Sequence, residues 1–297
     1  MSRLEGDEDP FAHTRMSLGD HLDELRRRLV VGVGALAVAF GVGLYFAKPL
    51  AEFASRPMMR ALTWINADQV ERYEARLVDH PAESRDTYFV SADPAETRLR
   101  AEYTVPLRMT ALGTSEGFLY QLKLAGYFAV AVGGPVLLVQ MWSFVAAGLY
   151  AEERRTVTRS VPISLGLFLA GLFFGYQWMV PYGIYFLATA FTPEELVFTP
   201  RIAEYLPFLS TLTLVMGLVF QLPLVMHVVV RIGVVDRAML VRYRSYFVVG
   251  ALILAAILTP PDPYTQVLLA GPMILLYEIG LLWTRFVRRP AEREDPA

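Results

Sequence analysis

Long uninterrupted runs of apolar residues constrain the fold of this chain more than any other feature. Each run covers about 13 to 25 residues, a length typical of membrane-spanning helices and too long for strands. The 297 residues are 55% hydrophobic and only 19% charged, a balance that is unusual for a soluble domain. The sequence therefore predicts an all-α protein that crosses a membrane several times.

The apolar runs predict six transmembrane helices. They cover residues 29–47, 118–147, 161–190, 206–230, 246–258 and 264–283. The last two are expected to be short. The first of this pair would form a helix of about 20 Å, less than the hydrocarbon core of about 30 Å. Charges on both flanks favour two short spans over the alternative, a re-entrant hairpin.

Arginines in the short loops predict the orientation. Four clusters fall on one side of the membrane, whereas the short loops on the other side hold only Arg201. The clusters are Arg26–Arg28, then Arg154, Arg155 and Arg159, then Arg231, Arg237, Arg242 and Arg244, and finally Arg285, Arg288, Arg289 and Arg293. Because positively charged loops stay in the cytoplasm, we expect both termini there and the protein in the inner (cytoplasmic) membrane.

Three regions follow from this topology. Residues 1–28 are expected to be a cytoplasmic segment with an interfacial amphipathic helix, residues 29–284 the membrane domain, and residues 285–297 a cytoplasmic tail. The membrane domain contains an extended outer loop at about 51–117. The first ten residues are acidic and polar, so the first span, and not a cleaved signal peptide, is expected to direct insertion.

The segment before the first span has two distinct faces. Ser17 and Asp20 have the spacing of a capping box, which begins a helix. Apolar and polar side chains then follow separate faces of that helix. The apolar face holds Leu18, Leu22, Leu25 and Leu29, and the polar face holds His21, Glu24 and Arg28. Composition alone favours a positively charged membrane anchor with a Glu24–Arg28 ion pair.

A second carboxylate lies on the same predicted side of the membrane. Glu153 belongs to the acidic and basic segment Leu149–Arg155, between the second and third spans. Such a segment is usually a solvated turn. Two separated carboxylates could nevertheless bind two guanidinium groups, because each carboxylate can accept both arms of an arginine fork.

Several polar residues interrupt the later apolar runs. Gln221, Gln266 and Glu278 are candidates for contacts with neighbouring helices or partners, and a packing role is equally compatible with the sequence. Glu278 could pair with an arginine such as Arg285. Asp262 precedes Pro263, which predicts the start of the last helix.

The residue content of the chain argues against several other classes of protein. There are no cysteines, the four histidines have no metal-ligand spacing, and no nucleotide-binding loop or nucleophile motif is present. The net charge of −2 does not indicate a nucleic-acid partner. Gly171 and Gly175 predict close helix packing. We therefore expect no enzyme activity, metal or cofactor.

Five segments, taken together and in this order, resemble the TatC family of the twin-arginine protein export system. They are His21–Leu29, Arg56-Pro57, Gly133–Arg155, Phe220–Val225 and Leu258–Gly280. The resemblance covers all six predicted spans. It implies six helices in a concave, glove-like arrangement, and a multi-copy receptor that acts in Sec-independent export of folded proteins.

The resemblance also implies functional residues and partners. Glu24 and Glu153 would contact the twin-arginine signal peptide, Arg26 and Arg28 would support that site, and Pro57 and Asp262 would belong to the outer loop and hairpin. TatA-like and TatB-like single-span subunits would dock near the fifth span, among membrane lipid. The rival functions are a small ion-coupled permease, which should have ionisable residues at mid-membrane and repeated halves, and a membrane assembly scaffold.

Three features depart from the family pattern. Gln221 stands where many members carry glutamate, and Ala147 stands where a proline is common. The stretch of about 63–106 is longer than the usual first outer loop, and its composition suggests an added external cap.

Overall fold

The computed structural model describes residues 18–79, 108–190, 198–259 and 262–287, and every regular element within these ranges is a helix. In chain order the elements are α1 (Leu18–Tyr45), α2 (Ala47–Asp79), α5 (Glu116–Ala147), α6 (Ala151–Phe174), the π-helical turn η1 (Gly175–Met179), α7 (Val180–Ala190), α8 (Ile202–Val219), α9 (Leu222–Arg231), α10 (Arg237–Arg242), α11 (Arg244–Leu258) and α12 (Pro263–Thr284).

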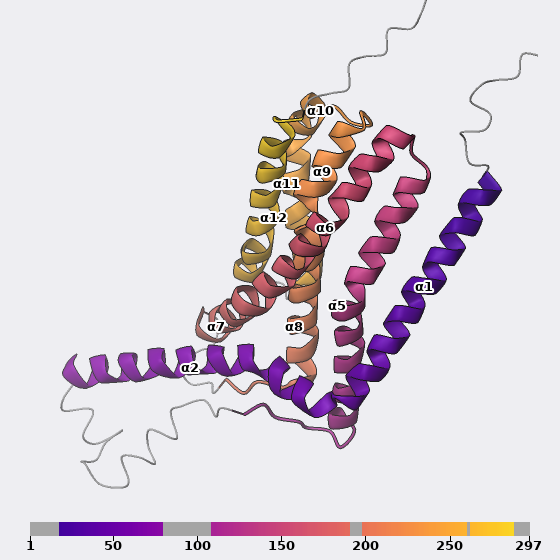
Figure 1. The fold of residues 1–297 in the computed structure, drawn as a ribbon. Coiled ribbons are helices and arrows are strands. Elements are labelled where there is room, and N and C mark those ends of the chain that lie inside the picture. Colours follow the sequence, from indigo (N-terminus) through magenta and orange to yellow (C-terminus); the bar gives the residue numbers. More distant parts are fainter. Residues whose placement is uncertain (1–17, 80–107, 191–197, 260–261, 288–297) are drawn as a thin grey trace, which may run out of the picture.

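Most helices run up and down beside one another, whereas α2 lies across one end of the bundle (Figure 1). Five continuous helical segments are long and apolar enough to cross a membrane, and α11 is a shorter apolar helix. With 15 residues, α11 is about 22 Å long. The 22 residues of α12 reach about 33 Å. The prediction that both of the last helices are short is therefore confirmed for α11 and wrong for α12.

α1 is one continuous helix of 28 residues. The expected interfacial helix does not turn before the membrane, because residues 18–28 continue directly into the span. The sequence contains neither proline nor glycine between Asp20 and Val31, so nothing interrupts the helix there. The predicted capping residue Ser17 lies outside the described residues.

α2 replaces the first part of the predicted outer loop. Pro57 lies inside this helix and not in a loop, and its ring has no amide hydrogen for the carbonyl of Phe53, four residues earlier. The hydroxyl of Tyr176 in η1 donates to that carbonyl at 2.6 Å. Tyr205 in α8 donates to the neighbouring carbonyl of Ala54. Tyrosine hydroxyls from the bundle thus donate to α2 carbonyls at the point where the proline interrupts the hydrogen bonding of the helix.

In a third hydrogen bond, α2 supplies the donor and the bundle supplies the acceptor. Pro181 has no amide hydrogen for the carbonyl of Gln177, and Arg60 of α2 donates to this carbonyl at 3.2 Å. α2 is therefore a packed part of the membrane domain. The rest of the predicted external cap, residues 80–106, lies outside the described residues.

Removing one hydroxyl should loosen this attachment. We expect Tyr205→Phe to destabilise the protein by about 1 kcal/mol, because it removes a buried hydrogen bond between α8 and the Ala54 carbonyl of α2. Limited proteolysis should cut the α2 segment sooner, and the midpoint of thermal unfolding should fall. Tyr127→Phe is the matched control, since its hydroxyl has no hydrogen bond within the described ranges. Equal behaviour of the two variants would contradict this account.

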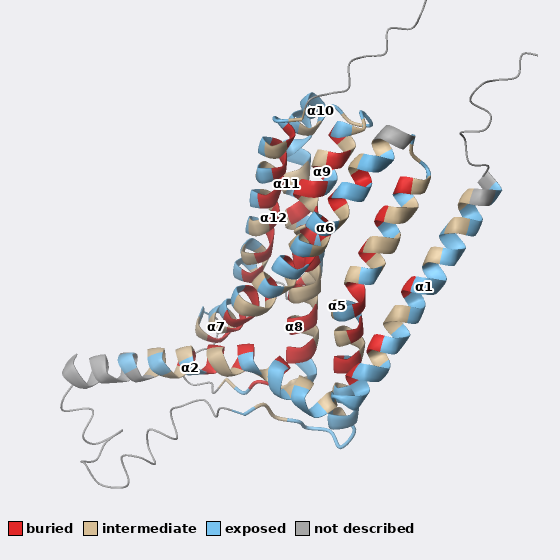
Figure 2. Ribbon diagram, viewed as in Figure 1, coloured by how far each residue is buried: buried red, intermediate tan, exposed pale blue. Residues whose placement is uncertain are grey.

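The core lies where the helices meet, and their outward faces are largely exposed apolar surface (Figure 2). α6 and the η1 turn that follows it approach α8 closely at the two glycines of the GxxxG pattern. A β-carbon on Gly171 would lie 2.4 Å from the carbonyl oxygen of Met216, and one on Gly175 would lie 2.8 Å from the α-carbon of Thr213. The prediction of close helix packing is confirmed.

Candidate functional site

The first turns of α1 carry the candidate residues Glu24, Arg26 and Arg28. Glu24 and Arg28 form an ion pair one helical turn apart, and the side chain of each is about one-fifth exposed. This confirms the pair that their spacing predicted. Arg26 is exposed.

An aromatic contact positions this end of α1 against α5. The His21 ring stacks on Phe144 with centroids 4.4 Å apart. Gly148, just beyond the end of α5, lies beside the same imidazole. Glu24 therefore lies one turn from the contact that joins α1 to the α5–α6 connection.

Glu153 lies in the first turn of α6. One of its carboxylate oxygens accepts from the backbone amide of Tyr150 at 3.2 Å, as in a capping box. The positive end of the helix dipole also favours a carboxylate here. The other oxygen remains available as an acceptor, because Glu153 forms no ion pair within the described ranges.

Glu24 and Glu153 lie at the same end of the bundle, where α1 begins and α5 connects to α6 (Figure 1). They do not contact each other. Below them an apolar groove of about 390 Å³ runs between α1, α5 and α8. Arg28 lines this groove together with Phe144 and Leu218. The end of the bundle thus combines two carboxylates, their adjacent arginines and an apolar surface.

Gln221 lies in a buried polar network that connects three spans. The indole N–H of Trp142 donates to the Ser164 hydroxyl at 2.8 Å, and this hydroxyl donates to Gln221 Oε1 at 2.6 Å. Gln221 Nε2 donates in turn to the Ser164 carbonyl at 3.1 Å. The network lies at the break between α8 and α9, where Pro223 lacks an amide hydrogen.

Sequence reasoning identified Gln221 but missed its two partners. Ser164 was hidden in a long apolar run, although a hydroxyl inside a membrane helix was the signal that could have singled it out. Trp142 gave no signal, because an indole in an apolar run needs no special explanation. A role of Gln221 in contacts with another subunit stays a prediction.

The remaining candidates are distributed over the last two spans. Glu278 pairs with Arg244 at 2.5 Å and not with Arg285, because α11 packs beside α12. Gln266 donates to the carbonyl of Leu252 at 3.0 Å, which also joins α12 to α11. Asp262 accepts from the amide of Thr265 at 2.7 Å, and its predicted role as a helix cap is confirmed.

The apolar helices, packed through glycines and buried polar groups, define a multi-pass helical membrane protein with a charged site at one end of its bundle. The family model for the Sec-independent protein translocase protein TatC matches residues 20–272. The chain belongs to the TatC family, a family of protein-transport components.

Relatives and solved structures agree with this membership. The TatC protein of Azotobacter chroococcum is 32% identical over 97% of this chain and 95% of its own length. The Escherichia coli TatC is 30% identical over 93% of this chain and 91% of its own length. A crystal structure of a twin-arginine translocase receptor, TatC, superposes with a TM-score of 0.67 at 27% identity, covering 91% of this chain and all of that one.

Proposed function

We propose that this protein is the receptor subunit of a twin-arginine translocase. It binds the paired arginines of signal peptides on folded cargo and organises TatA-like and TatB-like subunits for export. In this proposal six helices cross the inner membrane in a concave arrangement, with both termini in the cytoplasm. The observation that carries the proposal is the location of Glu24 and Glu153 at one end of the bundle, each with acceptor capacity left for a guanidinium group.

The Glu24–Arg28 pair supports this recognition chemistry. A carboxylate has two oxygens with about four acceptor positions, so Glu24 can accept a signal-peptide arginine while it keeps contact with Arg28. Arg28 holds the carboxylate in place beside the apolar groove. That groove suits the apolar residues that would accompany a signal peptide into the membrane.

The outward face of α11 supports the proposed docking of single-span subunits. Four large apolar residues at helical spacing are exposed there, with Tyr246 73% and Ile257 75% exposed. Val249 and Ile253 lie between them on the same face. An apolar stripe on a short helix is a suitable surface for another membrane helix.

The proposed orientation can be tested with single cysteines, because the chain has none of its own. We expect Val234→Cys to be shielded from a membrane-impermeant thiol reagent in intact cells. Thr114→Cys and Pro263→Cys should be labelled from outside. Labelling after cell disruption is the control for access. Protection of Pro263→Cys in intact cells would favour a re-entrant hairpin and contradict the six-span topology.

A further inference from the structure

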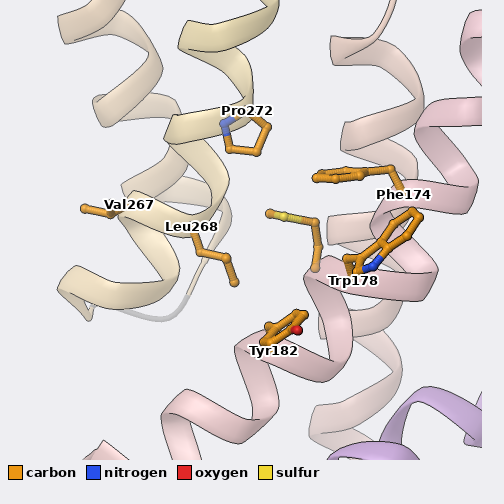
Figure 3. Close-up of a pocket in the computed structure, with 7 residues that line it drawn as sticks. Phe174, Trp178, Tyr182, Val267, Leu268 and Pro272 are labelled. Carbon is orange, nitrogen blue, oxygen red and sulfur yellow. The ribbon is translucent and has the colours of Figure 1, made fainter.

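An apolar cavity of about 500 Å³ opens between α12 and the α6–η1–α7 segment (Figure 3). This volume lies in the usual range of ligand pockets. Aromatic and aliphatic side chains form its walls. The lining residues are Phe174, Trp178, Met179, Tyr182, Val267, Leu268 and Pro272. Trp178, Tyr182 and Val267 are substantially exposed, so the cavity is accessible from the side.

One face of α2 brings positive charge to this cavity. Arg56, Arg60 and Trp64 follow one another at intervals of four residues, which places them on the same side of the helix. Trp64 packs on the cavity residue Tyr182 with ring centroids 5.1 Å apart. Arg60 donates to the carbonyl of Gln177, the residue before Trp178 of the cavity wall. In Figure 3 the α2 ribbon passes below Trp178 and Tyr182.

Both arginines retain unused hydrogen-bonding capacity. Arg60 uses one N–H group for Gln177, and the guanidinium of Arg56 lies 5.7 Å above the Phe53 ring. Neither forms an ion pair with a carboxylate within residues 18–79, 108–190, 198–259 and 262–287. Glu52, one turn before Arg56, is exposed and not within ion-pair distance of it. These two guanidinium groups, on the face of α2 that packs against η1, therefore have no carboxylate partner within the described ranges.

We propose that this cavity and the Arg56–Arg60 face of α2 form a binding site for an anionic phospholipid. The phosphate contacts the two guanidinium groups, which match its geometry, and an acyl chain lies against Trp178 and Tyr182. Basic groups beside transmembrane helices are known to recognise acidic lipid headgroups. The lipid would connect α2 to α12, two elements that are far apart in the sequence.

The test is a titration of the full-length purified protein in neutral detergent with phosphatidylglycerol or with phosphatidylcholine of the same acyl chains, followed by native mass spectrometry. We expect tighter binding of phosphatidylglycerol, and about a fivefold loss of its affinity in Arg56→Gln. Arg56 makes no hydrogen bond within the described part of the chain and contacts only the Phe53 ring there, so this variant should keep its structure. Arg237→Gln, an exposed arginine at the other end of the bundle, is the charge-matched control and should bind as the unmodified protein does.

A second variant tests the cavity. Val267→Trp, at the exposed rim, should fill it and weaken binding of both lipids while phosphatidylglycerol remains preferred. Equal binding of the two lipids by the unmodified protein would overturn the proposal. Equal losses in Arg56→Gln and Arg237→Gln would overturn it too. Unchanged lipid binding in Val267→Trp, with weaker copurification of a single-span subunit, would reassign the cavity to a protein helix.

Discussion

Replacing Glu24 or Glu153 by alanine is expected to weaken binding of a twin-arginine peptide by about 10- to 100-fold while membrane insertion stays normal. The reason is that a hydrogen bond to a charged group contributes about 1.5–3 kcal/mol. The measurement is peptide affinity or crosslinking at matched expression. Glu152→Ala should have a much smaller effect, because the family match falls on Glu153. Full binding by the Glu24/Glu153 double variant would disprove the acidic-pair mechanism.

The structure allows charge to be separated from helix capping at Glu153. Its carboxylate accepts from the amide of Tyr150, so alanine removes a cap as well as a charge. Glutamine can still accept that hydrogen bond. Glu153→Gln should therefore keep the stability of the protein but lose peptide affinity. A Lys-Lys peptide should bind less well than Arg-Arg, because ammonium groups cannot form the bidentate fork.

Replacing Ser164 by alanine is expected to lower the free energy of unfolding by about 1–3 kcal/mol. The hydroxyl is fully buried, and its loss leaves the Trp142 indole and Gln221 Oε1 without their partner. The unfolding midpoint in detergent should fall clearly. Hydrogen bonds inside membrane proteins are often weaker than this. We therefore expect the loss of unfolding free energy to lie toward the lower end of this range.

Ser160→Ala is the matched control for this experiment. Ser160 is buried in the same helix, but its hydroxyl donates only to the carbonyl of Thr156 one turn earlier. Its loss should cost less than about 0.5 kcal/mol, since it leaves no side chain of another helix unpaired. If both serine variants unfold at the same temperature, the network does not hold the three spans together.

Much of the fold was predictable because it depends on local patterns. Apolar length alone predicted the long helices, and the spacing of Glu24 and Arg28 predicted their ion pair. Asp262 before Pro263 predicted a helix cap in the same way. These features involve residues within a turn or two of each other, so no knowledge of distant neighbours was needed.

The sequence-based prediction was wrong where a residue far away in the sequence determines the local structure. The resemblance implied an outer loop at Pro57, and a proline inside a helix leaves a carbonyl without its donor. The hydroxyl of Tyr176, more than a hundred residues away, supplies that donor. The polar composition after Pro57 was likewise read as a loop, although α2 packs along the end of the bundle.

The sequence by itself determined the class of this protein, its apolar spans and the family to which it belongs. These depend on composition, periodicity and motif order, which are properties of the chain alone. Only the tertiary structure decided that Glu278 pairs with Arg244, that Gln221 joins Ser164 and Trp142, and that Arg60 reaches the η1 turn. The physical reason is that a buried polar group must find a partner, and packing determines which group is near enough to be that partner.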